Sequence, residues 1–149
     1  MPTLTTNPRA RFDYSILETF EAGLVLFGHE AKGIKNNRMS LKGSYVTIKK
    51  GEAWLINAQI SPYQPKNTPK EYDPTRSRKL LLHKREISSL IGKTKQKGLT
   101  LVPLRVYTKH DRVKLEFGLA QGKRKIDKRE KIKKREFNRR AERALRNKP

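Results

Sequence analysis

The sequence predicts a mainly β protein, a small closed barrel of six strands with short flanking helices and a basic C-terminal tail. Three observations support this fold class. Runs rich in β-branched and aromatic residues recur between residues 12 and 121, joined by connections that contain Gly or polar residues. Two short segments with helical spacing lie between these runs. The last 28 residues hold 14 Lys or Arg and contain no such run.

The chain length of 149 residues suits one domain of about 100–150 residues with an extension. We therefore expect three parts. Residues 1–11, with two prolines, two arginines and few apolar side chains, form a mobile basic N-terminal arm. Residues 12–121 form the barrel domain, and residues 122–149 form the tail.

The first half of the barrel is predicted to contain a long strand, a short helix and a hairpin. Residues 12–27 are rich in β-branched and aromatic side chains and indicate one strand, bent at Gly23 because Gly weakens regular pairing. A short helix follows over residues 30–36. Residues 44–50 and 53–60 flank a short polar connection that contains Gly, which is typical of a β-hairpin.

The second half is predicted to begin with a loop, because residues 61–77 contain four prolines. A short strand over residues 79–82 leads into a helix over residues 84–97, which ends before a Gly. Residues 99–108 and 112–120 form two further strands, the second with alternating apolar and charged side chains. Antiparallel hairpins among six strands favour an oligonucleotide-binding-type barrel, because closure removes exposed sheet edges.

The charge of the chain indicates a nucleic-acid partner. The net charge is +22 and the pI is about 10.6. The tail carries +10 of this charge and the rest of the chain +12, so both parts should bind polyanions. The absence of Cys excludes a Cys zinc site, a disulfide framework and thiol catalysis. No apolar run approaches about 18 residues, so we expect a soluble cytoplasmic protein without a membrane partner.

No group of residues has the spacing of a catalytic or metal site. His29, His83 and His110 are scattered, and the acidic residues occur singly, usually beside basic ones. No Gly-rich run fits a phosphate-binding loop. We therefore expect no enzyme activity, no catalytic residue, no bound metal and no cofactor.

Basic residues gather in the N-terminal arm, at the opening of the tail and in one internal block. The block comprises Arg76, Arg78, Lys79, Lys84 and Arg85. Such clusters favour contacts with RNA phosphates, although any single Lys is equally compatible with solvation. On charge, we assign RNA contacts to Arg9, Arg11, Lys84, Arg85, Lys123 and Lys125. Tyr63 and Tyr72 in the Pro-rich loop could stack on bases, but packing against the barrel is the favoured interpretation.

The tail combines a composition typical of disorder with a spacing typical of a helix. Each of its four acids has a base four residues later, in the pairs Asp127–Lys131, Glu130–Lys134, Glu136–Arg140 and Glu142–Arg146. Each pair contributes roughly 0.2–0.5 kcal/mol to an isolated helix. We expect a segment that is disordered when free and helical along RNA, once its charge is neutralised. A solvated charge run is the simpler alternative, and the few apolar residues disfavour a membrane-surface helix.

Several motifs occur together in an order that resembles one bacterial family. They include Glu21-Ala22-Gly23, Gly28-His29-Glu30-Ala31-Lys32, Arg78-Lys79-Leu80-Leu81-Leu82-His83-Lys84-Arg85-Glu86-Ile87, and Gly118-Leu119-Ala120-Gln121-Gly122-Lys123 followed by Asp127-Lys128-Arg129. On these motifs the chain resembles the SsrA-binding protein family, also called small protein B, from about Asn7 to its end. The block over residues 78–87 is very specific.

The resemblance implies an oligonucleotide-binding-like barrel that binds the elbow of the tRNA-like domain of transfer-messenger RNA (tmRNA), as one monomer per RNA. It implies delivery of this RNA to ribosomes stalled on messages without a stop codon, in the rescue process called trans-translation. The tail is then expected to lie as a helix in the empty messenger channel, near the decoding centre of the small subunit. A ribosomal protein and a general basic RNA-binding protein are the alternatives.

The resemblance also implies roles for individual residues. Matched family positions assign RNA contacts to Asn7, Glu21, Leu81 and Lys114. Asp127, Lys128 and Arg129 match the tail motif for accommodation on the ribosome. On charge, this ribosome-binding site extends to Lys131, Lys133, Lys134 and Arg135. In one departure, Ile126 stands where the family often has an aromatic or His ring, so ring stacking on a ribosomal base is not expected there.

Overall fold

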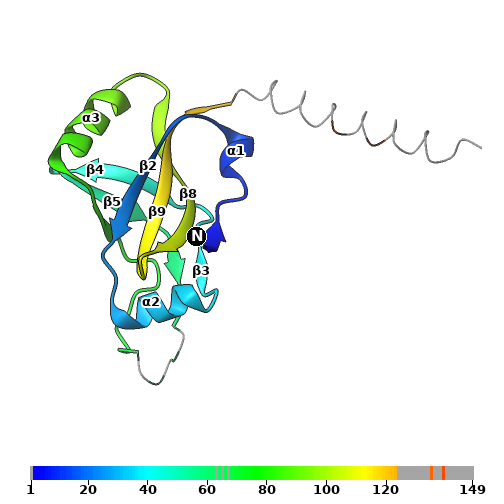
Figure 1. The fold of residues 1–149 in the computed structure, drawn as a ribbon, viewed down its shortest axis with the longest axis vertical. Coiled ribbons are helices and arrows are strands. Elements are labelled where there is room, and N and C mark those ends of the chain that lie inside the picture. The colour runs from blue at the N-terminus through cyan, green and yellow to red at the C-terminus, as the bar shows by residue number, and fades with distance from the viewer. Residues whose placement is uncertain are drawn as a thin grey trace, which may run out of the picture.

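The computed structural model describes residues 2–62, 64, 66 and 68–123, together with Arg135 and Arg139. Strands predominate in these residues, as the sequence predicted, and three short helices lie between them (Figure 1). The elements in chain order are β1 (Thr3–Thr6), α1 (Ala10–Asp13), β2 (Tyr14–Leu24), α2 (Gly28–Lys35), β3 (Met39–Ser40), β4 (Tyr45–Lys49), β5 (Glu52–Ile56), β6 (Gln59–Ile60), β7 (Arg78–Leu81), α3 (Lys84–Thr94), β8 (Leu99–Lys109) and β9 (Arg112–Gly122).

Six of the described strands form a closed ring. Their hydrogen-bonded order is β8-β4-β5-β7-β2-β9, and β9 pairs again with β8. All of these pairings are antiparallel. β1 lies along β8 outside the ring, while β3 and β6 form a separate two-stranded sheet. The predicted closure of six strands is therefore confirmed.

Residues 2–11 have more regular structure than the mobile arm that the sequence predicted. Thr3–Thr6 forms β1, which pairs antiparallel with β8. The amide nitrogen of Asn7 donates to Leu104 O at 2.8 Å, and its side-chain Nδ2 donates to Pro103 O at 2.9 Å. Ala10, at the start of α1, is buried in a small apolar cluster. The prediction of a mobile arm is wrong for these residues, because the Thr-rich run pairs with the part of β8 that β4 does not cover.

β2 is shorter than predicted and connects the two halves of the ring. It begins at Tyr14 rather than residue 12, because Ala10–Asp13 forms α1. A β-bulge interrupts its pairing with β9 between Ile16 and Glu18. Gly23, where the sequence predicted a bend, is the residue at which β2 pairs with both β9 and β7.

Two tight turns connect neighbouring strands, as predicted. Lys50 (φ 52°) and Gly51 (φ 74°) join β4 to β5, while His110 (φ 51°) and Asp111 (φ 61°) join β8 to β9. Left-handed backbone at both turn positions matches the right-handed twist of the flanking strands. The second turn fixes the register between β8 and β9, which carry part of the candidate site.

The hydrophobic core fills the ring. The apolar side chains that alternate along β9 are buried as predicted, and Phe117 stacks on Phe20 of β2 with ring centres 5.5 Å apart. Figure 1 shows α2 at one end of the strands and α3 at the other, and they contribute the buried side chains Ile34 and Leu90. Both helices occur where predicted, although α3 ends at Thr94 rather than residue 97. The polar residues that alternate with the core positions face outward.

Candidate RNA-binding surface

The strand register brings three predicted RNA contacts together on the outer face of the ring. Gly23 of β2 pairs with Leu81 of β7 on one side and with Lys114 of β9 on the other. Glu21 lies on the same face of β2, one pleat away. The side chains of Leu81 and Lys114 both lie over Gly23, because a Cβ added there would be 3.4 Å from Leu81 Cβ and 3.6 Å from Lys114 Nζ, in ordinary van der Waals contact with each.

This group combines an exposed apolar side chain with several charges. Leu81 is 56% exposed. A hollow of about 220 Å³ lies beside it, and the charged residues of its lining are Lys35, Asp111, Arg112 and Lys114. An apolar side chain among cations suits RNA, whose sugars and bases contact apolar groups while its phosphates attract cations.

Glu21 is held by groups on β8. The Tyr107 hydroxyl donates a hydrogen bond to Glu21 Oε2, and Lys109 Nζ lies 3.5 Å from Oε1. The Tyr107 hydrogen bond, Lys109 and Lys114 lower the pKa of Glu21, outweighing the opposite effect of partial burial. Its side chain remains 37% exposed. Glu21 is therefore an ionised acceptor that RNA can reach.

Tyr107 lies beneath this surface and is only 1% exposed. Arg105 covers its ring, with Cζ 4.3 Å from the ring centre. Arg105 is itself held by Thr3 Oγ1 of β1 at 3.2 Å and by Glu116 Oε2 of β9 at 3.3 Å. Burial and the neighbouring Glu21 raise the pKa of Tyr107 far above its ordinary value, so the phenol stays protonated and donates.

A second group of predicted RNA contacts forms around α1. Arg9 and Arg11 are exposed at the start and in the middle of this helix. Lys123 Nζ donates to Arg11 O at 2.8 Å, which attaches the end of β9 to α1. A groove of about 650 Å³ lies between the segment containing Asn7 and Arg9 and the segment 39–43. The structure thus brings Asn7, Arg9, Arg11 and Lys123 to one region.

Lys84 and Arg85 lie at the start of α3, directly after β7, and both are exposed. The amide of His83 donates to Glu86 Oε1 at 3.2 Å, which fixes this helix start. Cations at the N-terminal end of a helix oppose its dipole, so an external anion such as a phosphate relieves the repulsion. Their position favours the predicted phosphate contacts.

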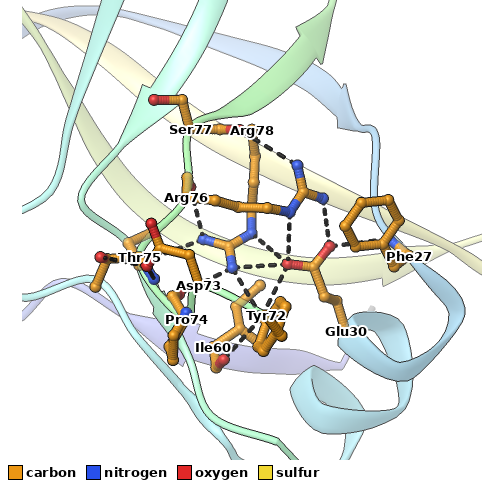
Figure 2. A network of polar contacts seen from close by, with 11 residues as sticks. Phe27, Glu30, Ile60, Tyr72, Asp73, Pro74, Thr75, Arg76, Ser77 and Arg78 are labelled. Atoms are coloured by element: carbon orange, nitrogen blue, oxygen red, sulfur yellow. Dashed lines mark hydrogen bonds and ion pairs between the residues drawn. The ribbon is translucent and has the colours of Figure 1, made fainter. Parts of the chain in front are cut away.

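Two arginines of the predicted basic block have a structural role instead. Arg78 and Glu30 are both fully buried, and Arg78 Nη2 and Nε lie 2.7 and 2.9 Å from Glu30 Oε2 (Figure 2). Arg76 donates to both oxygens of the same carboxylate and lies over the Phe27 ring at 4.1 Å. These two members of the basic block, which as a whole was predicted to favour RNA phosphates, instead direct most of their donors to Glu30.

Each guanidinium nitrogen of Arg78 has an acceptor. Besides the bonds to Glu30, Nη1 donates to Ala58 O at 2.6 Å and Nη2 donates to Pro74 O at 2.9 Å. One side chain therefore connects α2, the residues before β6 and the end of the Pro-rich loop. Arg78 is the first residue of β7, so this network anchors the start of the strand that carries Leu81.

Glu30 is the acceptor at the centre of this network. Burial raises the pKa of Glu30, but hydrogen bonds from Arg76, the Phe27 amide and Arg78 outweigh it and lower that pKa to about 2. The carboxylate is thus ionised inside the protein, where its charge is fully compensated by the two arginines.

Tyr72 packs into the protein, in agreement with the favoured interpretation. Its ring meets His29 edge-on, with centres 4.7 Å apart. Its hydroxyl lies 3.0 Å from Glu30 Oε2, and burial together with this carboxylate raises the pKa of Tyr72 to about 12. Tyr63, the other tyrosine of the Pro-rich loop, lies outside the described residues.

Part of the predicted site also lies outside the described residues. This part comprises Lys125, Asp127, Lys128, Arg129, Lys131, Lys133 and Lys134. Arg135 is described, and its side chain is exposed. In the part of the chain that the structure describes, no group of three or more His, Cys, Asp or Glu is placed to hold a metal ion. Within that same part, no helix is long and apolar enough to cross a membrane.

Comparison with known proteins decides the family. The SmpB protein family matches residues 4–147 of this chain. The chain belongs to the SmpB family. The SmpB match spans the ring, both groups of candidate RNA contacts and the tail positions that lie beyond the described residues.

Individual SmpB relatives cover nearly the whole chain. The SsrA-binding protein of Thermosynechococcus vestitus is 52% identical over 142 residues, which cover 95% of this chain and 93% of the relative. That of Geobacillus thermodenitrificans is 53% identical over 143 residues, covering 96% and 92%. A solved structure described as "tmRNA-SmpB: a journey to the center of the bacterial ribosome" matches with a TM-score of 0.69 and 44% identity, covering 88% of this chain and 95% of that one.

Proposed function

We propose that this SmpB-family protein binds the tRNA-like domain of tmRNA and delivers it to stalled ribosomes for trans-translation. Its role is ribosome rescue and the tagging of incomplete proteins. The observation that carries the proposal is the family match over residues 4–147. Relatives named SsrA-binding proteins and a neighbour described as tmRNA-SmpB in the bacterial ribosome support it. They do not favour a ribosomal protein or a general basic RNA-binding protein.

The outer face around Gly23 supplies a physical basis for selecting one RNA. Lys114 attracts a phosphate, and the exposed Leu81 packs on a sugar or base. Glu21 is repelled by phosphates, so a carboxylate on this basic face implies a donor from the RNA, such as a base amino group or a 2′-hydroxyl. We assign affinity mainly to the cations and selectivity mainly to Glu21 and Leu81.

The second group, around α1, extends the proposed contact. Arg9, Arg11 and Lys123 supply phosphate contacts, which strengthen binding without reading sequence. Asn7 uses one Nδ2 hydrogen to bond Pro103 O, which leaves the second hydrogen and the acceptor Oδ1 for its proposed RNA contact. Lys84 and Arg85 add phosphate contacts from the start of α3.

For the tail we propose a helix in the empty messenger channel of the small subunit, near the decoding centre. The acid-first i,i+4 pairs and the charge of +10 support this role. Self-repulsion opposes the helix in solution, and a channel lined with phosphates removes that repulsion. The proposed ribosome contacts are Asp127, Lys128, Arg129, Lys131, Lys133, Lys134 and Arg135.

We further propose that the protein acts by binding alone. It carries out no reaction of its own, requires no cofactor, and works in the cytoplasm as a monomer with one copy per RNA. The composition without Cys and the scattered His residues support this part of the proposal.

A binding comparison tests the RNA partner. The isolated tRNA-like domain of tmRNA is compared with an ordinary tRNA and a generic duplex at two salt concentrations. We expect a preference for the tRNA-like domain that persists at high salt, because contacts to base edges and shape release no counterions. Equal binding to all three RNAs, lost together as salt rises, would contradict the proposal and indicate a general basic protein. Stoichiometric co-sedimentation with ribosomal subunits at high salt would indicate a ribosomal protein.

A pair of variants at Ile132 tests the tail. Ile132→Pro costs a helix about 3 kcal/mol, whereas Ile132→Ala preserves helix propensity. We expect both variants to bind the tRNA-like domain normally. In a translation system with a message lacking a stop codon, the Pro variant should abolish tagging and the Ala variant should retain most of it. Normal tagging by the Pro variant would refute a functional tail helix.

A further inference from the structure

We propose that Tyr107 is a positioning residue for RNA recognition, which holds the Glu21 carboxylate in the orientation that reads the RNA. The inference rests on the proposed RNA-binding function and adds a residue that contacts the RNA only through another. Tyr107 is 1% exposed, so it offers almost no surface to a macromolecule. Its hydroxyl nevertheless donates to a carboxylate on the candidate surface.

The register shows how a buried phenol reaches this carboxylate. Tyr107 of β8 pairs with Lys114 of β9, and Glu21 of β2 pairs with Glu116 of β9. The Tyr107 side chain therefore crosses β9 diagonally to reach β2. Its ring is fixed from above by Arg105, at 4.3 Å. A buried and covered ring has one rotamer available, so the position of its hydroxyl is fixed as well.

Every charged group around Glu21 would otherwise displace its carboxylate. Lys109 Nζ lies 3.5 Å from Oε1, and Lys114 attracts the same group from β9. Glu116 stands directly opposite in the register and repels it, although Glu116 is engaged by Arg105. A freely rotating Glu21 could shorten its ion pair with Lys109 or turn toward Lys114, and either change would neutralise a cation needed for phosphate.

Lys109 already forms a loose ion pair with Glu21, with Nζ 3.5 Å from Oε1, and the hydrogen bond from Tyr107 keeps the carboxylate from turning further toward either lysine. That hydrogen bond occupies Oε2, while Oε1 keeps its longer contact with Lys109 and the side chain stays 37% exposed. The RNA therefore meets a carboxylate whose orientation is already set, beside a lysine that is still able to meet a phosphate. Orientation fixed before binding removes an ordering cost from the binding step.

Two variants that each delete a single buried hydroxyl separate positioning from stability. Tyr107→Phe keeps the ring and its contact with Arg105 but removes the bond to Glu21. Tyr72→Phe is the matched control, because its hydroxyl serves the buried Glu30 network, away from the proposed contacts. We expect Tyr107→Phe to weaken binding of the tRNA-like domain by roughly 3- to 10-fold. Tyr72→Phe should lower the melting temperature and leave the affinity of the folded protein unchanged.

A double-mutant cycle tests whether Tyr107 acts through Glu21. In a Glu21→Ala background, Tyr107→Phe should weaken binding by less than about 2-fold, because its partner is absent. The same loss in both backgrounds would overturn the proposal. By NMR titration of the free protein, Tyr107→Phe should raise the pKa of Glu21 while Tyr72→Phe leaves it unchanged. An unchanged Glu21 titration in Tyr107→Phe would also overturn it.

The wild-type protein, measured in the same assay, separates this inference from the proposed function. Wild type without preference for the tRNA-like domain would refute the RNA partner. If wild type and Tyr107→Phe bind with the same preference while Glu21→Ala loses it, the proposed function stands and the positioning role of Tyr107 is refuted. The salt dependence should be equal for wild type and Tyr107→Phe, because a hydroxyl releases no counterions.

Discussion

Glu30 and Glu21 have similar partners but opposite relations to solvent. Each accepts a hydrogen bond from a tyrosine hydroxyl and lies beside at least one cation. Glu30 is fully buried, whereas the Glu21 side chain is 37% exposed. The same residue types therefore make a structural junction in one place and a candidate recognition group in the other.

The difference lies in the cations and in the acceptor capacity that remains. The planar guanidinium groups of Arg76 and Arg78 each donate several hydrogen bonds to Glu30, and these bonds compensate the cost of burying its carboxylate. Around Glu21 the cations are lysines, which are point charges on flexible stems. A carboxylate surrounded by cations is thus a recognition group only where solvent, and hence a ligand, reaches it.

Replacing Glu30 should have the largest effect. Glu30→Gln leaves the buried Arg78 and the partly exposed Arg76 without a compensating charge, so we expect a loss of about 3–5 kcal/mol in the free energy of unfolding. Urea unfolding followed by circular dichroism measures it. Glu21→Gln is the matched control and should cost less than about 1 kcal/mol, because its surroundings are solvated. Similar losses for both variants would show that burial does not distinguish the two sites.

The pH dependence of stability should distinguish wild type from Glu30→Gln. The pKa of Glu30 falls from 4.5 to about 2 on folding. A lowered pKa in the folded state gives stability that is present above pH 4.5 and is lost as pH falls towards 2. A shift of this size corresponds to about 3 kcal/mol. Between pH 5 and pH 2, wild type should therefore lose about 3 kcal/mol more than Glu30→Gln, measured by urea unfolding at each pH. Parallel pH curves would contradict the assigned role of Glu30.

For RNA binding, we expect Glu21→Gln to have a larger effect than Glu30→Gln, the reverse of their order for stability. Glu21→Gln should weaken binding of the tRNA-like domain by roughly 10-fold, because a hydrogen bond to a charged group is lost. Glu30→Gln should bind normally at temperatures where it remains folded. Lys114→Gln should instead lower the slope of log K against log salt by about 0.7–0.9, as expected for one phosphate contact. A Glu21→Gln variant that binds as tightly as wild type would remove Glu21 from the recognition surface.

The sequence predicted the features that short stretches of chain encode. The alternation along β9 and the polar turn at Lys50 and Gly51 are local signals, and both are confirmed. The Glu30–Arg78 pair joins residues 48 positions apart, and no local pattern encodes such a pair. Charge alone therefore placed Arg78 in a basic block predicted to favour RNA phosphates, since a sequence shows that a residue is basic but not that it is buried.

The candidate site was predictable to a similar extent. Exposed cations such as Lys84 and Arg85 follow from charge, and the structure leaves them exposed. Glu21 came only from the family resemblance, because an acidic residue on a basic surface has no signal of its own. Tyr107 gave no signal at all, since its role depends on the register that carries it across β9 to Glu21. β1 was missed for a related reason, because its pairing depends on how much of β8 is left free by β4.

The ion pair between Lys93 and Glu18 should show the smallest effect and sharpens the comparison most. Its N–O distance of 2.7 Å equals that between Arg78 and Glu30, but its side chains are 34% and 48% exposed. Exposed pairs typically contribute less than about 0.5 kcal/mol, because water screens them and ordering two long side chains costs entropy. Lys93 also lies 5.4 Å from the Phe20 ring centre, so a double-mutant cycle of Lys93→Gln with Glu18→Gln is needed to isolate the pair.

A coupling below about 0.5 kcal/mol that vanishes in 1 M salt would show that burial, and not distance, makes the Glu30 network structural. A coupling near that of the buried pair would show that distance, and not burial, sets the strength of these ion pairs, and would weaken the argument that exposure leaves Glu21 available to RNA.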